Sequence, residues 1–355
     1  MSWSQYGGTV NGDDITDGFG DDVALNALGN IMVIGAQYDD NGGSNSGRVT
    51  IWNLDSNGDW EEKAGWNGNS SNQFVGVSVS INYVGDIIAF GGNGWYGTAI
   101  YKNSAHSSGG NSWSLQGTII PFNSSSATGE SVSLNDTGDR IAISASPVVI
   151  YKWSGSSWSS ESSFTPTSWI GQSVSINGNG DMVVVGGQNI DTDNDPGTEL
   201  RVYKRTGSTW ATTFAPSIEE VDPSSNRNIY VDFNGDGSVL AVGLSLFDNG
   251  KGKALIYRYT NGSPDSGTTV EVGDQGIGWT TMTGCKISVN AAGDKVVVAS
   301  PGFDTGAQDR GKVAIYKYNG SSWIEEWDIE GDTIYNYLSF GSHINALGTR
   351  VALGI

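Results

Sequence analysis

The stretch from residue 79 to residue 90 reads Val79-Ser80-Ile81-Asn82-Tyr83-Val84-Gly85-Asp86-Ile87-Ile88-Ala89-Phe90. Its first part alternates apolar and polar residues, as a strand with one buried face does. Its last part is continuously apolar, which suits a strand buried on both faces. The Asn-x-x-Gly sequence between them is a turn signal, because Asn tolerates the left-handed backbone region and caps turns, while Gly supplies positive φ. The stretch therefore predicts two short strands joined by a tight turn.

This unit recurs seven times along the chain. Successive turn asparagines lie 56, 53, 42, 57, 56 and 55 residues apart, at Asn26, Asn82, Asn135, Asn177, Asn234, Asn290 and Asn345. Most repeats add a third strand that ends in an aromatic residue, such as Tyr101, and a fourth that begins at tryptophan, such as Trp113. Four short antiparallel strands in each of seven repeats predict an all-β fold, a seven-bladed β-propeller forming a single domain over residues 1–355.

The two ends of the chain each contain part of a repeat. Residues 3–10 match residues 113–120, an outer strand, and residues 342–353 match the first two strands of a repeat. We expect the N-terminal strand to close the ring in the last blade, since closure leaves fewer exposed sheet edges. The third strand of that blade is missing from the sequence. The natural chain continues past Ile355, the blade is incomplete, or a partner fills it; continuation is favoured.

Composition excludes several classes of protein. Glycine makes up 52 of 355 residues, about twice the usual share, which disfavours long helices. The 13 Trp, 14 Tyr and 10 Phe argue against disorder. The net charge of −20 argues against nucleic acid and anionic membranes as partners. No apolar run is long enough for membrane insertion as a helix.

Short motifs at strand boundaries resemble those of a known repeat. They are Phe19-Gly20 and Phe340-Gly341, with Ala145-Ser146-Pro147 and Ala299-Ser300-Pro301. Their order resembles the FG-GAP repeats of integrin-α-like β-propellers, and the resemblance covers essentially the whole chain. In that family the loop between the first two strands often holds calcium through Asp-x-Asn-x-Asp-Gly-x-x-Asp. The resemblance therefore implies one calcium loop here, in the fifth repeat, where the last carboxylate is replaced by Leu240 and the remaining ligands are Asp232, Asn234 and Asp236.

A second acidic loop suggests calcium independently of the resemblance. Calcium takes six to eight oxygen ligands, so aspartates at alternate positions are the relevant signal. They occur here as Asp191, Asp193 and Asp195. Gly197 falls one place later than in an EF-hand loop, so a solvated acidic loop is the alternative interpretation. Ca²⁺ is the one cofactor that the sequence suggests.

Catalytic motifs find little support in the sequence. Its two histidines, His106 and His343, lie near no recognisable nucleophile motif, and the single cysteine, Cys285, is expected to pack in the core. The sequence box of propeller sialidases is absent. We therefore predict a protein that is not an enzyme and has no catalytic residues.

The connections between second and third strands vary in length and content, whereas the Asn-x-x-Gly turns are monotonous. Variable loops on a rigid scaffold are where function usually lies. The adjacent aromatics in one such loop could stack on a sugar ring or anchor a protein contact, or else cap the core. The predicted binding face comprises Tyr38, Asp39, Trp95, Tyr96, Phe247 and Phe303.

These features together predict a non-enzymatic, exposed recognition or structural module that belongs to a larger assembly and binds protein or glycan on a surface. An acidic, lysine-poor chain suits life outside the cell, and Met1 to Gln5 lack the features of a signal peptide. A virion surface component such as a fibre, spike or capsid decoration accounts for both observations. The alternatives are a secreted or cell-surface FG-GAP-type adhesin that depends on calcium, and a propeller lectin.

Overall fold

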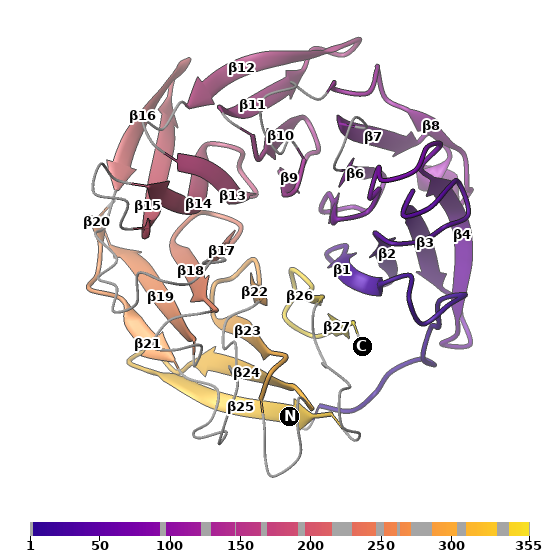
Figure 1. The fold of residues 1–355 in the computed structure, drawn as a ribbon. Helices are drawn as coiled ribbons and strands as arrows, with labels where there is room; N and C mark the ends of the chain where they lie inside the picture. Colours follow the sequence, from indigo (N-terminus) through magenta and orange to yellow (C-terminus); the bar gives the residue numbers. More distant parts are fainter. Residues whose placement is uncertain are drawn as a thin grey trace.

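A computed structural model of the chain describes residues 3–92, 97–121, 129–145, 147–164, 169–190, 196–214, 229–245, 252–260, 263–270, 286–303, 310–331 and 341–354. The strands form antiparallel sheets that follow one another around a ring, with the first strand of each sheet nearest the centre (Figure 1). In the described residues the single helical element is a 3₁₀ turn, η1 (His106–Ser108). No described helix is long and apolar enough to cross a membrane.

Six of the sheets are complete blades. The first three are β1 (Phe19–Leu25), β2 (Ile31–Ala36), β3 (Arg48–Leu54) and β4 (Trp60–Asn67); β5 (Ser78–Ile81), β6 (Ile87–Gly92), β7 (Gly97–Asn103) and β8 (Trp113–Leu115); and β9 (Val132–Leu134), β10 (Arg140–Ile143), β11 (Val148–Trp153) and β12 (Trp158–Phe164). The next three are β13 (Trp169–Ile176), β14 (Met182–Ile190), β15 (Pro196–Thr206) and β16 (Thr209–Phe214); β17 (Ile229–Phe233), β18 (Val239–Leu244) and β19 (Lys253–Thr260), with β20 (Ser263–Pro264) and β21 (Thr268–Val270) both paired to β19; and β22 (Lys286–Val289), β23 (Lys295–Ser300), β24 (Lys312–Tyr318) and β25 (Trp323–Glu330).

The remaining sheet has two strands, β26 (Ser342–Ile344) and β27 (Val351–Leu353), and lies between the sixth blade and the first (Figure 1). The prediction of an all-β propeller with four-stranded antiparallel blades is confirmed. The predicted number of seven blades is wrong for the described residues, which form six complete blades and one two-stranded sheet. Residues 3–10, predicted to form an outer strand, carry no strand hydrogen bonds in this structure.

Hydrogen bonds from one inner strand to the next connect the sheets around the centre of the ring. Each passes from a backbone N–H to a side-chain acceptor on the preceding inner strand. The acceptor and donor residues are Asp22 and Val79 (2.8 Å), Ser80 and Leu134 (3.0 Å), Ser133 and Ile176 (3.1 Å), Ser175 and Phe233 (3.1 Å), Asp232 and Val289 (2.8 Å), Ser288 and Ile344 (3.3 Å), and His343 and Leu25 (3.2 Å). Buried backbone donors are thereby satisfied at every junction between neighbouring sheets.

The seven Asn-x-x-Gly turns share one geometry. In every turn the Asn Oδ1 accepts a hydrogen bond from the backbone N–H five residues further on, as Asn82 does from Ile87 at 2.9 Å. The glycine of each turn has positive φ, between 65° and 91°. The asparagines do not, so their role is to cap the turn through the side chain, and the left-handed residue is glycine alone.

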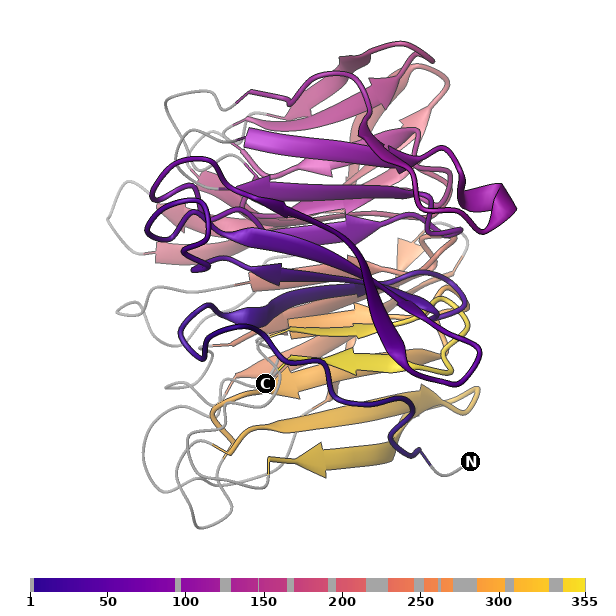
Figure 2. The same ribbon diagram turned by 90° about the vertical axis from the view of Figure 1, so that its right-hand side faces the viewer.

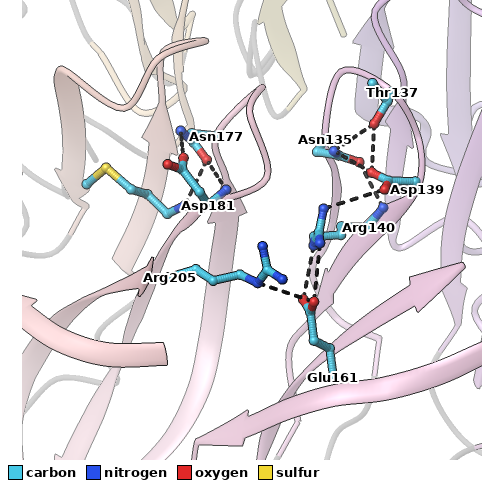
Figure 3. A network of polar contacts seen from close by, with 9 residues as sticks. Asn135, Thr137, Asp139, Arg140, Glu161, Asn177, Asp181 and Arg205 are labelled. Atoms are coloured by element: carbon cyan, nitrogen blue, oxygen red, sulfur yellow. Dashed lines mark hydrogen bonds and ion pairs between the residues drawn. The ribbon is translucent and has the colours of Figure 1, made fainter. Parts of the chain in front are cut away.

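Charged residues add contacts between the third and fourth blades (Figure 3). Arg140 on β10 donates from Nε to the Glu161 carboxylate on β12 at 3.0 Å, and Arg205 on β15 lies 3.3 Å from the same carboxylate. Burial acts to raise the pKa of Glu161, but the hydrogen bond and positive charge of Arg140, with the charges of Arg205 and Lys152, outweigh it, so the net pKa is lowered. The side chains of Arg140 and Glu161 are largely buried, which limits screening of their interaction.

Aromatic side chains pack where neighbouring blades meet. Trp66 at the end of the first blade lies 4.4 Å from Tyr101 and 6.2 Å from Trp113, measured between ring centroids. Phe164 makes the same contacts between the third and fourth blades, at 3.8 Å to Tyr203 and 6.1 Å to Trp210. The third-strand tyrosines and fourth-strand tryptophans of these blades therefore belong to the core between blades.

Asn177→Ala tests the turn geometry (Figure 3). Asn177 is fully buried and its Oδ1 accepts from the amides of Asp181 (3.0 Å) and Met182 (2.8 Å), so truncation leaves buried donors without a partner. We expect the free energy of unfolding, measured by urea denaturation, to fall by about 1–3 kcal/mol. The control is Asn179→Ala in the same turn, where the side chain is exposed and the change should stay within about 0.5 kcal/mol. Equal effects from the two substitutions would contradict the prediction.

Candidate functional site

Two connections of the first blade are locked together on one face of the ring. Residues 37–47 join β2 to β3, and residues 68–77 join β4 to β5. Backbone hydrogen bonds run from Asn72 to Ser44 (2.8 Å), Phe74 to Asn45 (3.1 Å), Val75 to Ser46 (3.0 Å) and Gly68 to Gly47 (2.8 Å). Figure 2 shows these connections at one end of the strands and the Asn-x-x-Gly turns at the other. We call the first of these ends the loop face.

Backbone strain is concentrated in the same two connections. Among the described residues, the non-glycine residues with positive φ are Asn45 (50°), Asn72 (61°) and Phe74 (48°). Asparagine tolerates this region, but a bulky residue such as Phe74 rarely adopts it. Strained conformations of this kind persist only where the surrounding contacts enforce them, and they cluster at functional sites. The paired loops are therefore rigid as well as exposed.

Tyr38 is the predicted binding residue that the structure places on this surface. Its side chain is 43% exposed, and its ring meets the edge of the Phe74 ring at 6.0 Å between centroids. Phe74, held by its strained backbone, thus supports an aromatic ring that remains available to a ligand.

Two other predicted binding residues are buried, which corrects the sequence interpretation. Asp39 is 2% exposed, because its carboxylate accepts hydrogen bonds from the N–H of Asn41 (2.8 Å) and from the Asn41 side chain (3.0 Å) and so shapes the loop from inside. Phe303 is 4% exposed and lies beneath the Lys312 ammonium, 5.3 Å from the ring centroid. The remaining predicted residues of the binding face, Trp95, Tyr96 and Phe247, lie outside the described residues.

Acidic residues surround Tyr38. The segment that leads into β1 carries Asp13, Asp14 and Asp17, and the backbone N–H of Tyr38 donates to the Asp17 carbonyl at 3.1 Å. Burial raises the pKa of the Asp17 carboxyl, and the negative charges of nearby aspartates, Asp39 first, raise it further. Ile15 is fully exposed in the same segment. This part of the loop face combines negative charge with exposed apolar side chains.

A polar groove of about 450 Å³ runs beside these loops. Arg48 lines it and pairs with Asp13 and Glu62, which also line it, each at 2.9 Å. The Nε of Arg48 is buried and has no hydrogen-bond partner, an unusual state for a charged group. The other residues that line the groove are Asn41, Gly65 and Asn67. Charged and amide groups in an open groove suit a polar ligand rather than an apolar one.

The structure does not bring the three calcium candidates of the fifth repeat together. Asp232 is half-buried, and its carboxylate accepts hydrogen bonds from the amide of Val289 (2.8 Å) and the hydroxyl of Ser175 (3.0 Å). Asn234 presents its Nδ2 donor, not an oxygen, to the carboxylate of Asp236 at 2.8 Å. No cluster of three metal-binding side chains occurs among the described residues. Asp191, Asp193 and Asp195 lie outside them, so calcium binding stays a prediction.

The centre of the ring contains a narrow channel of about 250 Å³, which the sequence analysis did not identify. The inner strands line it with serines and apolar residues, and Lys286 pairs with Asp22 at 3.0 Å. Burial raises the pKa of Asp232 to about 6 and lowers that of His343 to about 4. The sequence does contain a signal for Asp232 and His343. Each lies two residues before its turn asparagine, at the position where four other repeats have serine.

Comparisons with known proteins support the fold and leave the family open. No protein-family model matches the chain, and no curated protein sequence matches it significantly. Solved structures do match. A protein from Lactobacillus plantarum is 12% identical, with a TM-score of 0.55 over 93% of this chain and 86% of that one. Hydrazine synthase of Kuenenia stuttgartiensis is 10% identical, with a TM-score of 0.60 over 99% and 98%. The WD40 repeats of RRP9 are 11% identical, with a TM-score of 0.60 over 95% and 87%.

Identities this low establish the shared fold alone. The propeller is therefore supported by likeness to known structures. Membership of the FG-GAP family is not confirmed, since no family model matches.

His343→Ser and Asp232→Ser test the electrostatics of the inner ring, because serine accepts the same hydrogen bond at four equivalent positions. His343 has a pKa below its usual 6.5 in the folded chain, so its contribution to stability is complete above pH 6.5 and is lost as the pH falls towards 4. Asp232 has a raised pKa, so the folded state binds its proton more tightly and stability rises as the pH falls from 6 towards 4.

We therefore expect His343→Ser to reduce acid destabilisation between pH 6.5 and 4. Asp232→Ser should steepen that acid destabilisation and raise stability at pH 7 to 8. The measurement is the free energy of unfolding from urea denaturation at several pH values. Parallel pH profiles for both variants and the parent chain would contradict the assignment.

Proposed function

We propose that this chain is a non-enzymatic recognition module that binds a protein or glycan through the loop face of its propeller. The observation that supports this most directly is the pair of interlocked, strained loops that hold Tyr38 exposed beside an acidic surface. A closed ring of blades provides the rigid base on which such loops keep their shape.

The environments of the histidines support a role without catalysis. His343 is half-buried, and its Nδ1 accepts the hydrogen bond of the Leu25 amide, so the ring nitrogen takes part in holding the fold together. His106 lies in the 3₁₀ turn η1, outside the channel and the groove.

We propose an exposed setting outside the cell for this module, as part of the surface of a virus particle. The support is compositional, because a net charge of −20 and few lysines favour solubility in an exposed assembly. A cell-surface adhesin has the same chemical requirements. Detection of the protein in purified particles, rather than in cell envelopes, distinguishes the two settings.

A glycan is the second candidate ligand, and the groove around Arg48 favours it. Carboxylate, amide and guanidinium groups line this groove, with the Tyr38 loop beside it. A sugar needs polar and aromatic partners, because its hydroxyls hydrogen-bond to polar groups and its apolar faces stack on aromatic rings.

Tyr38→Ala tests the proposed face. The fluorescently labelled protein is screened on a glycan array and on intact cells, and the affinity for the best ligand is then measured for each variant. We expect Tyr38→Ala to weaken binding at least tenfold, as truncation of an aromatic hot spot does. The matched control is Tyr83→Ala, which removes an equally exposed tyrosine (43%) from an Asn-x-x-Gly turn at the other end of the strands. An equal loss of affinity in the two variants, or no loss in either, would contradict the proposal.

We also propose that residues 3–10 take the place of the outer strand of a seventh blade. Trp3 packs 6.3 Å from Trp327, with the Lys295 ammonium 4.8 Å from the Trp3 ring centroid. At the other end of this segment, Val10 packs on a cluster that includes Val23 of the first blade and Ala352 of β27. The segment thus contacts both neighbouring blades, as outer strands do elsewhere in the ring.

Trp3→Ala tests this placement of the N-terminal segment. Loss of the Trp3 contacts should lower the free energy of unfolding by about 1–3 kcal/mol, less than for a fully buried tryptophan. The control is Tyr6→Ala, since Tyr6 is 59% exposed in the same segment and should matter less. If the urea midpoint is unchanged when Trp3→Ala and Tyr6→Ala are combined, the segment does not belong to the fold.

A further inference from the structure

The central channel is lined by more carboxylates than cations. Lys286 is the one lysine or arginine in its lining, and this side chain pairs with Asp22 at 3.0 Å. Glu130 and Asp136 also line the channel, and within the part of the chain that the structure describes neither carboxylate has a hydrogen bond or an ion pair. The channel therefore carries negative charge that no side chain of the lining balances.

These two carboxylates lie towards opposite ends of the channel. Glu130 lies two residues before the inner strand β9, and Asp136 follows the turn asparagine at the other end of that strand. A separation of six residues corresponds to about 20 Å of extended chain. Asp232 on β17 lies two residues before its own turn asparagine, so its carboxylate is at a level between them. Negative charge is thus distributed along the channel and is not gathered at one point.

Small residues surround the end of the channel at the Asn-x-x-Gly turns. The residue after the turn asparagine lines the channel in every repeat, and two of these residues, Tyr83 and Asp136, have large side chains. The others are Ala27, Gly178, Gly235, Ala291 and Ala346. A Cβ at Gly178 would lie 2.4 Å from Oδ2 of Asp136, so the carboxylate reaches across this end towards the next turn.

Acceptors without donors also occur towards the loop face. Gln172 has the position of Glu130 in the next repeat, and its buried Oε1 has no hydrogen-bond partner among the described residues. Ser342 on β26 is 7% exposed, and its Oγ has no partner there either. Burial raises the pKa of the Glu130 and Asp136 carboxyls, because solvating water is displaced from the charged form. Buried acceptors of this kind are costly unless a ligand supplies hydrogen-bond donors.

The spacing of these groups selects the shape of the ligand. No three metal-binding side chains lie together among the described residues, so the charge is not arranged around a compact ion. Between the charged levels the lining is apolar, as at Val132 and Leu134 of β9. A narrow channel with separated carboxylates and apolar walls between them fits a linear chain of methylene groups that carries several ammonium groups.

We propose that the central channel binds a linear polyamine. One terminal ammonium lies at Glu130 and Gln172, the other lies at Asp136, and an inner ammonium lies near Asp232. The ammonium groups donate the hydrogen bonds that these acceptors lack, and the methylene groups lie against the apolar layers. This site is inside the ring and does not depend on the loop-face proposal.

Spermine, a linear tetra-amine, is the probe. It is titrated calorimetrically into the 355-residue protein at about 0.15 M salt, which screens general attraction to a chain of net charge −20. We expect saturable binding of one spermine per chain, and a melting temperature that rises with spermine concentration because the ligand binds the folded state. Putrescine, a much shorter diamine, does not reach both ends of the channel and should bind at least about tenfold more weakly.

Protein variants locate the site. Glu130→Gln combined with Asp136→Asn should weaken spermine binding at least about tenfold, because both terminal ion pairs are lost. The matched control combines Asp14→Asn with Asp59→Asn, which removes the same charge from exposed residues outside the channel and should leave binding unchanged. The channel variant should fold, since neither carboxylate makes a hydrogen bond in the described chain, and its urea midpoint checks this.

Three outcomes would overturn the proposal. They are the absence of saturable binding at one spermine per chain, equal affinity of the channel variant and the control variant, and equal affinity of the parent chain for spermine and putrescine. The second outcome would show general attraction to surface charge. If the channel variant does not fold, the comparison of spermine with putrescine on the parent chain decides.

Discussion

The hydrogen bond from a backbone amide to a side chain on the preceding inner strand is the interaction on which the ring depends. It occurs at all seven junctions between sheets, including the two that join β26 to its neighbours, through Ser288 to Ile344 and His343 to Leu25. Because these amides are buried, the loss of an acceptor leaves a donor without a partner, which is more costly than an ordinary lost hydrogen bond. Serine meets this need without charge. Asp22, Asp232 and His343 meet it with ionisable groups, and the shifted pKa values of the last two connect the stability of the ring to pH in opposite directions.

The connections at the two ends of the strands are constrained to different degrees. The Asn-x-x-Gly turns are uniform because each asparagine satisfies the amides of its own turn, and there is little room for variation. The connections at the opposite end of the strands are not constrained in this way. In the first blade they have developed their own hydrogen bonds, with a strained Phe74 that supports Tyr38. Rigid loops that display an aromatic ring lose little conformational entropy when a ligand binds.

The two-stranded sheet has a different significance. Open sheet edges are sites of association, and most proteins cover or interrupt them. Among the residues that the structure describes, no strand pairs with the outer edge of β27, and Val351 and Leu353 are partly exposed there.

Local sequence determined the strands and turns of this protein, because alternation of apolar residues and the Asn-x-x-Gly turn are properties of neighbouring residues. The repeat of that unit predicted the propeller, and the glycines adopt the positive φ that the turn requires. The number of complete blades and the fate of individual polar residues were decided by tertiary structure. Asp39 and Phe303 look like exposed loop residues but are buried by contacts within their folded loops. Asp232 resembles a calcium ligand, yet its carboxylate bonds to Val289 in the next blade, and His343 bonds to Leu25 across the closure of the ring. These partners lie 57 and 318 residues away, and no local pattern specifies which residues a closed ring brings together.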